Sequence, residues 1–202
     1  MKAQKFVKDY IKRSSKVLVN LSKGGVLESV VKTTQAILEC YYKKGGAVYL
    51  FGNGGSAVQA QHIAEELVSG FRMFDPKRFS LSAQALTVDG AKITAISNDF
   101  GFDQIFARQL DSVLHSSDVA IAFSTSGKSP NVLEALKLAR KRGAVTIGIS
   151  GKSGGDLPKM CDIVIRIPSS EVSIIQEGHA VVGHALCAAV EEGLFGREVL
   201  TF

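Results

Sequence analysis

Five short apolar runs, each followed by a segment of helical or turn character, constrain the fold of this chain more than any other feature. The runs occupy residues 47–51, 81–88, 119–124, 145–150 and 163–167. Helix-like segments separate them, at about 56–69, 90–110, 129–142 and 155–160. Apolar strands joined by helical crossovers form a parallel sheet that is covered on both faces. We therefore predict an α/β protein in which a parallel sheet lies between two layers of helices.

Helices are also predicted on both sides of this pattern. Residues 1–43 are expected to form two helices, the second running from about 27 to 42 and stopped by Gly45 and Gly46. Residues 172–194 are predicted to form one long C-terminal helix. With 202 residues, 46% of them hydrophobic, the chain can bury one sizeable core. We therefore predict one domain, residues 1–202, in which 1–43 form a helical appendage.

The net charge of +5 raises the question of a nucleic-acid partner. The basic residues near the start are Lys2, Lys5, Lys8, Lys12, Arg13 and Lys16. Phe6, Tyr10, Val17 and Leu21 recur among them at helical spacing. This pattern is more typical of an amphipathic helix with a solvated basic face than of a phosphate-binding patch. We therefore expect no nucleic-acid partner.

The cysteines and the apolar runs bear on the cellular compartment. Cys40, Cys161 and Cys187 are odd in number and include no Cys-x-x-Cys pair. This argues for core thiols in a reducing compartment, and against a disulfide framework or a thiolate zinc site. Residues 1–20 lack the continuous apolar core of a signal peptide, and no run approaches the roughly 20 residues that cross a bilayer. We expect a cytoplasmic protein without a membrane partner.

A glycine-rich turn follows the first apolar run. Gly52-Asn53-Gly54-Gly55 lies between that run and the next helix, where Ser56 is predicted to be the N-cap. Without Cβ atoms the backbone can adopt positive φ and bring its N–H groups close to an oxygen-rich ligand. Ligands of parallel α/β sheets bind at the carboxyl ends of the strands. We therefore predict that this turn binds a phosphorylated sugar.

A second loop, after the run 119–124, is rich in hydroxyl groups. Ser124, Thr125, Ser126 and Ser129 surround a glycine and lead directly into a helix whose first turn holds Pro130. Hydroxyl groups and the free N–H groups of a helix N-terminus form a receptor for a phosphate dianion. The alternative is that Ser129 only caps the helix and the other hydroxyls face solvent. Neither loop has the spacing of dinucleotide-binding or ATP-binding glycine motifs.

Two titratable side chains follow the glycine turn on one helix. His62 and Glu66 are four residues apart, so both project from one face about a turn below the loop. This spacing suits acid/base chemistry or metal binding. The alternative is a surface hydrogen bond, but the position at the carboxyl end of a strand favours a site.

The C-terminal helix holds two more histidines. His179 and His184 are five residues apart, about 140° around a helix, so only one is expected to face the site. Helical geometry does not choose between them, and the other would be a core or interface histidine. Gln176 and His184 differ by about 80°, which permits both to approach one cation.

Taken together and in order, six short strings resemble the sugar isomerase (SIS) domain, and in detail the bacterial phosphoheptose isomerases. They are Phe51-Gly52-Asn53-Gly54-Gly55-Ser56, His62-Ile63-Ala64-Glu65-Glu66-Leu67, Asn98-Asp99-Phe100-Gly101-Phe102, Ser124-Thr125-Ser126-Gly127-Lys128-Ser129, Ser150-Gly151-Lys152, and Gln176-Glu177-Gly178-His179 with His184. The resemblance covers nearly the whole chain. It implies a three-layer α-β-α sandwich around a five-stranded parallel sheet of flavodoxin-like winding. It also implies an N-terminal helical pair that assembles a homotetramer, with active sites at subunit junctions.

The resemblance implies roles for particular residues. Those that would hold the sugar phosphate are Asn53, Gly54, Gly55, Ser56, Asn98, Asp99, Ser124, Thr125, Ser126, Ser129 and Gln176. Those that would ligate one zinc ion are His62, Glu66, Gln176 and His184. Glu66 and His184 would also form the acid/base pair, so the resemblance selects His184 over His179.

The implied reaction converts sedoheptulose 7-phosphate to D-glycero-D-manno-heptose 7-phosphate, the first step of ADP- or GDP-heptose biosynthesis for lipopolysaccharide or capsule. A ketose-to-aldose conversion removes a proton from C1 and delivers one to C2 through an enediol, so it needs two titratable groups. Glu66 and His184 are suitable in kind. Histidines and a carboxylate are ordinary zinc ligands, and a divalent cation would stabilise the developing oxyanion.

Two departures from the family pattern concern the choice of sugar. Gly70 stands where many relatives have an arginine, and Ser173 stands where relatives often have Thr or Asp.

Two other functions compete with the isomerase. One is a non-catalytic SIS protein that binds a sugar phosphate or a replication initiator, against which Glu66 and His184 both argue. The other is a SIS enzyme for a different sugar phosphate, although no amidotransferase or DNA-binding domain accompanies this chain.

Overall fold

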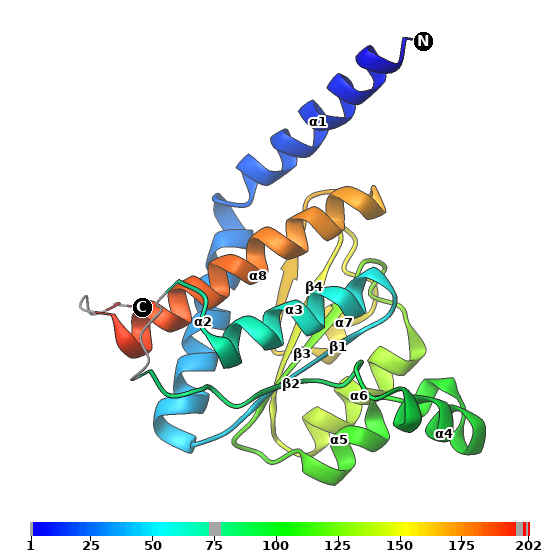
Figure 1. Cartoon of the computed structure of the whole chain (residues 1–202), viewed down its shortest axis with the longest axis vertical. Helices are drawn as coiled ribbons and strands as arrows, with labels where there is room; N and C mark the ends of the chain where they lie inside the picture. Colours follow the sequence, from blue (N-terminus) through cyan, green and yellow to red (C-terminus); the bar gives the residue numbers. More distant parts are fainter. Residues whose placement is uncertain (1, 73–77, 197–199, 201) are drawn as a thin grey trace.

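Five parallel strands form one sheet between two layers of helices (Figure 1). The computed structural model describes residues 2–72, 78–196, 200 and 202. The strands are β1 Val48–Gly52, β2 Ala83–Ala85, β3 Val119–Ser124, β4 Val145–Ser150 and β5 Ile163–Arg166. Their order in the sheet is β2-β1-β3-β4-β5, which is the flavodoxin-like winding. The predicted α/β fold and its parallel sheet are confirmed.

Eight α-helices and one 3₁₀ helix are assigned within the described residues. They are α1 Ala3–Asn20, α2 Gly24–Lys44, α3 Gly55–Ser69, α4 Gly90–Phe100, η1 Phe102–Gln104, α5 Ala107–Val113, α6 Pro130–Lys141, α7 Leu157–Met160 and α8 Val172–Phe195. The N-terminal helical pair and the long C-terminal helix are therefore present. Gly45 ends α2 in the left-handed conformation, at a φ of 59°, as the glycine pair predicted.

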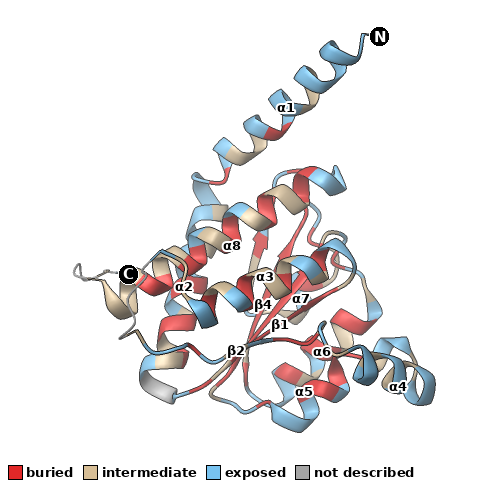
Figure 2. Ribbon diagram, viewed as in Figure 1, coloured by how far each residue is buried: buried red, intermediate tan, exposed pale blue. Residues whose placement is uncertain are grey.

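The strands alternate their side chains between two hydrophobic clusters, one on each face of the sheet, and Figure 2 shows the central strands coloured as buried. Leu50 and Ile121 enter the cluster that α2, α3 and α8 cover. Phe51 and Ala122 enter the other, which α5 and α6 cover. All residues of β1 and β3 are buried, because a strand at the centre of a three-layer fold has no solvent face.

Two predicted elements differ from the structure. The run 81–88 forms only three residues of strand, because β2 is an edge strand and Val88 at its end is 64% exposed. The helix predicted at 90–110 is interrupted. Gly101 ends α4 with a φ of 94°, in a region that favours glycine, and η1 and α5 follow. Helical periodicity alone does not reveal such a break.

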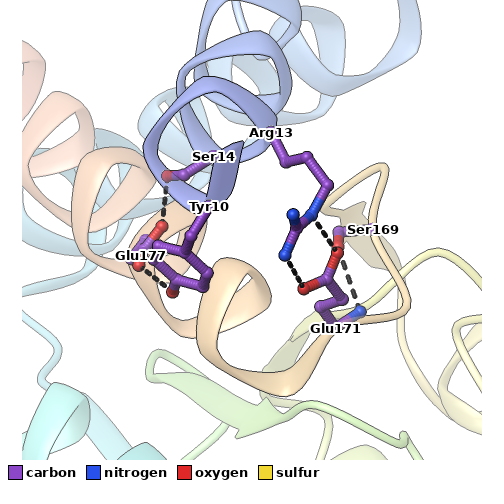
Figure 3. A network of polar contacts seen from close by, with 6 residues as sticks. All are labelled: Tyr10, Arg13, Ser14, Ser169, Glu171 and Glu177. Carbon is purple, nitrogen blue, oxygen red and sulfur yellow. Dashed lines mark hydrogen bonds and ion pairs between the residues drawn. The ribbon is translucent and has the colours of Figure 1, made fainter. Parts of the chain in front are cut away.

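Helix α1 extends from the body and contacts α8 mainly through polar side chains (Figures 1 and 3). The Tyr10 hydroxyl donates to the Glu177 carboxylate at 2.6 Å, and the Ser14 hydroxyl donates to the same carboxylate. Arg13 pairs with Glu171 at 3.1 Å. These contacts connect the N-terminal helix to the first two turns of α8.

Only part of the apolar face predicted for α1 therefore packs against the rest of the protein. Leu21, just after the helix, is buried, and Val17 packs against the core. Phe6, by contrast, is 55% exposed, because it lies on the part of α1 that extends beyond α8. In residues 2–72 and 78–196, no helix combines the length and the apolar character that a bilayer span requires. Cys40 and Cys187 are buried, as predicted for core thiols.

Asp118 fixes the start of β3, so its removal is expected to destabilise the fold. Its carboxylate is buried and accepts hydrogen bonds from the backbone N–H groups of Ala47, at 2.9 Å, and His115, at 2.7 Å. Asp118→Ala leaves both donors without this acceptor, so we expect the free energy of unfolding to fall by about 3 kcal/mol in urea titrations. Asp111→Ala, at an exposed position, is the control and should cost much less. Equal effects would contradict this role of Asp118.

Candidate active site

The glycine turn brings β1 and α3 together at the carboxyl edge of the sheet. A Cβ on Gly52 would lie 2.6 Å from the carbonyl oxygen of Phe123, so only glycine permits this approach of β1 to β3. Gly54 has a φ of 53° and is the N-cap of α3. The prediction that Ser56 is the N-cap is wrong, because the N-cap is Gly54, two residues earlier, and the helix begins at Gly55. Ser56 is instead buried in the first turn, and its N–H donates to the Asn53 carbonyl oxygen at 2.9 Å.

The hydroxyl-rich loop follows β3 at the same edge. The Ser124 hydroxyl accepts from the Gly127 N–H at 3.1 Å and lies 3.5 Å from the Ser129 hydroxyl. Ser129 is the N-cap residue of α6 by position, yet its side chain makes no capping hydrogen bond. Its hydroxyl points toward Ser124 instead, which argues against the alternative that Ser129 only caps the helix. Pro130 is the first residue of α6, as predicted.

A cavity of about 220 Å³ lies beside this loop. It is lined by Thr125, Ser126, Gly151, Lys152, Ser153, Ser169, Ser170, Val172 and Ile175. The lining combines hydroxyl groups with one lysine, which suits a polar, anionic ligand. The predicted residues Thr125 and Ser126 therefore border a polar cavity.

The three titratable residues of the predicted site lie together between α3 and α8. The Nε2 atoms of His62 and His184 are 2.8 Å apart, and His62 Nε2 is 3.7 Å from Glu66 Oε1. One potential ligand atom from each of the three residues lies within 4.8 Å of the others. At such distances either one imidazole donates its N–H to the other, or both direct lone pairs toward a shared cation. Histidines and a carboxylate are common zinc ligands, so this group fits a divalent metal in donor type and spacing.

The close packing of α3 against α8 makes this cluster possible. A Cβ on Gly183 would lie 2.4 Å from Cδ1 of Ile63, so the two helices meet where α8 has no side chain. Ile63 and Gly183 directly adjoin His62 and His184 in the sequence. The contact therefore sets the separation of the two imidazole rings. Phe71 packs against the His184 ring, with the centroids 5.3 Å apart.

His179 is a core residue rather than a member of the cluster. It is fully buried and packs against Phe123, with ring centroids 5.7 Å apart. Burial lowers the pKa of His179 to about 4, so its imidazole is neutral at pH 7. Of the two C-terminal histidines, His184 is the one that lies beside His62.

Gln176 lies against the start of α3. A Cβ on Gly55 would be 2.3 Å from the Gln176 side-chain nitrogen, so the amide occupies the space that this glycine leaves. Asn98 and Asp99 are placed elsewhere. Both are exposed on the last turn of α4, where Asn98 donates to Asp99 at 2.8 Å. Figure 1 shows α4 well separated from α3 and α8, so the structure does not bring these two residues to the histidine cluster.

The segment after α3 is hydrogen-bonded to the C-terminal part of α8. The Glu191 carboxylate is buried and accepts from the N–H of Phe71 at 2.8 Å and from that of Arg72 at 3.1 Å. The Arg72 guanidinium pairs with Glu192 at 3.0 Å. Arg72 is thus engaged at the C-terminal part of α8, and Gly70 offers no side chain in its place.

One residue that the sequence did not single out connects the two loops. Asn131, the second residue of α6, exchanges two side-chain hydrogen bonds with Asn53, at 2.8 and 2.9 Å. The sequence shows only one asparagine in the glycine turn and another in the first turn of the helix that follows the hydroxyl-rich loop. Their pairing becomes visible only once the two loops are known to be neighbours.

Comparison with known proteins identifies the class to which this fold and site belong. The SIS domain model matches residues 9–151, so the chain belongs to the SIS domain family. Within it, the chain belongs to the phosphoheptose isomerases. It is 43% identical over 173 residues to the phosphoheptose isomerase of Burkholderia pseudomallei, covering 86% of each chain. It is 40% identical over 198 residues to that of Aneurinibacillus thermoaerophilus, covering 96% of this chain and 98% of the relative.

Solved structures agree with this assignment. A phosphoheptose isomerase structure from Francisella tularensis matches with a TM-score of 0.89 at 33% identity, covering 95% of this chain and all of that one. The structure from Neisseria gonorrhoeae matches with a TM-score of 0.87, also at 33% identity and with the same coverage.

Because His179 is buried in its neutral form, it is expected to make stability depend on pH. A histidine whose folded pKa is depressed contributes stability above its unfolded value of 6.5, and this is lost as pH falls through about 4. His179→Phe cannot titrate, so the melting temperature of the wild type should fall relative to this variant between pH 7 and 4. The exposed position His115→Gln is the control and should follow the wild type. A constant difference between wild type and His179→Phe would refute the buried neutral imidazole.

Proposed function

We propose that this protein is an aldose-ketose isomerase that converts sedoheptulose 7-phosphate to D-glycero-D-manno-heptose 7-phosphate. The observation that carries the proposal is the cluster of His62, Glu66 and His184 between α3 and α8, in a chain of the phosphoheptose isomerase family. A non-catalytic SIS protein would have no need of a carboxylate and two imidazoles within 4.8 Å of one another.

The hydroxyl-rich loop is the proposed phosphate site. Ser124 and Ser129 bring their hydroxyls to within 3.5 Å of each other beside the N-terminus of α6, where the helix dipole favours a dianion. The glycine turn and Gln176 then lie toward the sugar carbons. The full proposed set of substrate-binding residues is Asn53, Gly54, Gly55, Ser56, Asn98, Asp99, Ser124, Thr125, Ser126, Ser129 and Gln176.

Glu66 and His184 are the proposed acid/base pair. One group removes the proton from C1 of the ketose, and the other delivers a proton at C2 or to the neighbouring oxygen. Glu66 is mostly enclosed, with 18% of its side chain exposed, while His184 is partly buried between His62 and Phe71. Limited access of water at this position favours proton transfer to the substrate over exchange with solvent.

We propose that His62, Glu66, Gln176 and His184 hold one zinc ion. The chemistry that zinc supplies when bound at such a site is Lewis-acid stabilisation of an oxyanion. His62 and His184 would offer their Nε2 atoms, which already face each other. Gln176, beside Gly55, would contribute a neutral oxygen from the adjoining turn of α8.

A homotetramer with sites at subunit junctions accounts for two further observations. Helix α1 extends from the body and exposes Phe6, Val7, Ile11 and Val19, each by more than half. Asn98 and Asp99 lie exposed on α4, away from the cluster, where they could reach the site of a neighbouring copy. In this proposal the whole chain is one SIS domain, residues 1–43 serve assembly, and the enzyme acts in the cytoplasm in heptose synthesis for lipopolysaccharide or capsule.

Glu66→Gln is expected to lower kcat by at least about a hundredfold, because a neutral amide cannot accept the proton. Zinc-supplemented protein is mixed with sedoheptulose 7-phosphate, and the anomeric proton of the aldoheptose phosphate is followed by NMR. Glu65→Gln, on the neighbouring exposed residue of the same helix, is the matched control and should keep its activity. No product from the wild type would refute the proposed function, and full activity in Glu66→Gln would remove Glu66 from the mechanism.

His184→Ala is expected to lower bound zinc and activity together, because it removes a proposed ligand and a proton carrier at once. The zinc content of purified protein is measured by elemental mass spectrometry. His179→Ala, on the same helix but in the core, should reduce stability and leave the zinc content per folded protein unchanged. The opposite result, with His184→Ala harmless and His179→Ala free of metal, would reverse the assignment.

A further inference from the structure

Asn53 and Asn131 form a reciprocal pair of side-chain amides. The pair connects the glycine turn after β1 to the start of α6, which follows the hydroxyl-rich loop; these are the two ligand loops. Asn53 Nδ2 donates to Asn131 Oδ1 at 2.9 Å, and Asn131 Nδ2 donates to Asn53 Oδ1 at 2.8 Å. Asn131 is only 1% exposed, while Asn53 is half-buried at the end of β1. The pair therefore joins a buried amide to one on a partly exposed residue.

Each asparagine is also hydrogen-bonded to the helix that starts beside it, Asn131 through its side chain and Asn53 through its backbone. Asn131 Oδ1 accepts from the Val132 N–H at 3.0 Å, within the first turn of α6. The backbone carbonyl oxygen of Asn53 accepts from the Ser56 N–H at 2.9 Å, within the first turn of α3. The two side-chain hydrogen bonds thus join a residue of the first turn of α6 to Asn53, whose backbone is bonded to the first turn of α3, the helix that holds His62 and Glu66.

The location of the pair gives it a mechanical role. The hydrogen-bonded pairing of β1 with β3 extends to Gly52 and Phe123, and the two loops begin just beyond. Past that point the amide pair bridges the loops. The separation between the phosphate site on one loop and the reacting carbons near the other is therefore set partly by Asn131.

The pair also orients the Asn53 amide. An amide has two N–H donors and two acceptor lone pairs, and Asn131 uses one of each. Asn53 keeps one N–H and one lone pair, in positions that Asn131 decides. A flipped Asn53 would place oxygen against oxygen and nitrogen against nitrogen within the pair, so the flipped state is disfavoured.

We infer that Asn131 is a positioning residue for sugar-phosphate binding, which orients the Asn53 amide and holds the two ligand loops at a fixed separation. This inference rests on the proposed function, since it concerns the substrate of the same site. Asn131 itself is buried and acts through Asn53.

The test is Asn131→Asp, which keeps the shape and removes one donor. Near pH 8 a carboxylate oxygen faces Asn53 Oδ1 without a proton between them, so we expect KM for sedoheptulose 7-phosphate to rise roughly tenfold to a hundredfold. A protonated carboxyl group has the donor and acceptor pattern of an amide. KM of the variant should therefore return toward the wild-type value as pH falls to about 5, with a smaller change in kcat.

Two controls separate this effect from a general loss of structure. Asn131→Ala removes the pair without adding a titratable group, so its KM should be raised at every pH. Asn20→Asp places the same carboxyl group at an exposed position and should follow the wild type. A pH-independent KM in Asn131→Asp, or a wild-type KM in Asn131→Ala, would overturn the inference.

Thermal unfolding distinguishes failure of this inference from failure of the proposed function. The new buried carboxyl group has a raised folded pKa, so its stability is greatest at low pH and is lost as pH rises through that value. The melting temperature of Asn131→Asp should therefore approach that of the wild type at pH 5 and fall below it at pH 8. If the wild type lacks isomerase activity but this convergence occurs, the amide pair stands and the substrate assignment falls. A constant difference would overturn the amide pair itself.

A double-mutant cycle serves if Asn131→Asp does not fold near pH 8. Asn53→Ala, Asn131→Ala and the double variant are compared for KM. If Asn131 acts through Asn53, the double variant should be no worse than the more impaired single variant. Multiplicative effects would show that Asn131 acts independently, which contradicts the inference.

Discussion

The parallel pairing of β1 with β3 is the constraint on which the rest of the site depends. Because the two strands end side by side, at Gly52 and Phe123, the loops that follow them leave the sheet at the same edge. The glycine at the end of β1 allows a backbone approach that any side chain would block. Both loops then start helices, so the N-termini of α3 and α6 lie at the same edge of the sheet, an arrangement that favours an anionic ligand.

A second close contact, between α3 and α8, gives this edge its reactive groups. Gly183 lets Ile63 reach the backbone of α8, and the residues next to them, His62 and His184, are brought within 2.8 Å of each other. The cluster thus arises from two segments that are 122 residues apart in the chain. Its geometry depends on a glycine that takes no part in the chemistry, so a change in helix packing would alter the site without touching a titratable residue.

Much of the fold followed from periodicity, and the exceptions have physical reasons. The runs 119–124 and 145–150 coincide with β3 and β4, because fully buried central strands have continuous apolar sequences. The predicted strand 81–88 is longer than β2, since an apolar segment at the edge of a sheet need not pair along its whole length. Gly101 ended a helix that the apolar pattern continued through, and Gly54 replaced Ser56 as a cap, because backbone dihedral angles are decided by tertiary contacts as well as by residue type.

The site was predictable where one helix supplied both partners and less so where the partners came from different elements. His62 and Glu66 follow from a spacing of four, whereas helical geometry alone left His179 and His184 open. Burial separates them: His179 lies against Phe123 in the core, and His184 lies beside His62. The sequence pattern does not identify Asn131 as a site residue, for a related reason. An asparagine in the first turn of a helix is ordinarily a local feature, and its function depends on the neighbouring loop amide, which only the strand order identifies.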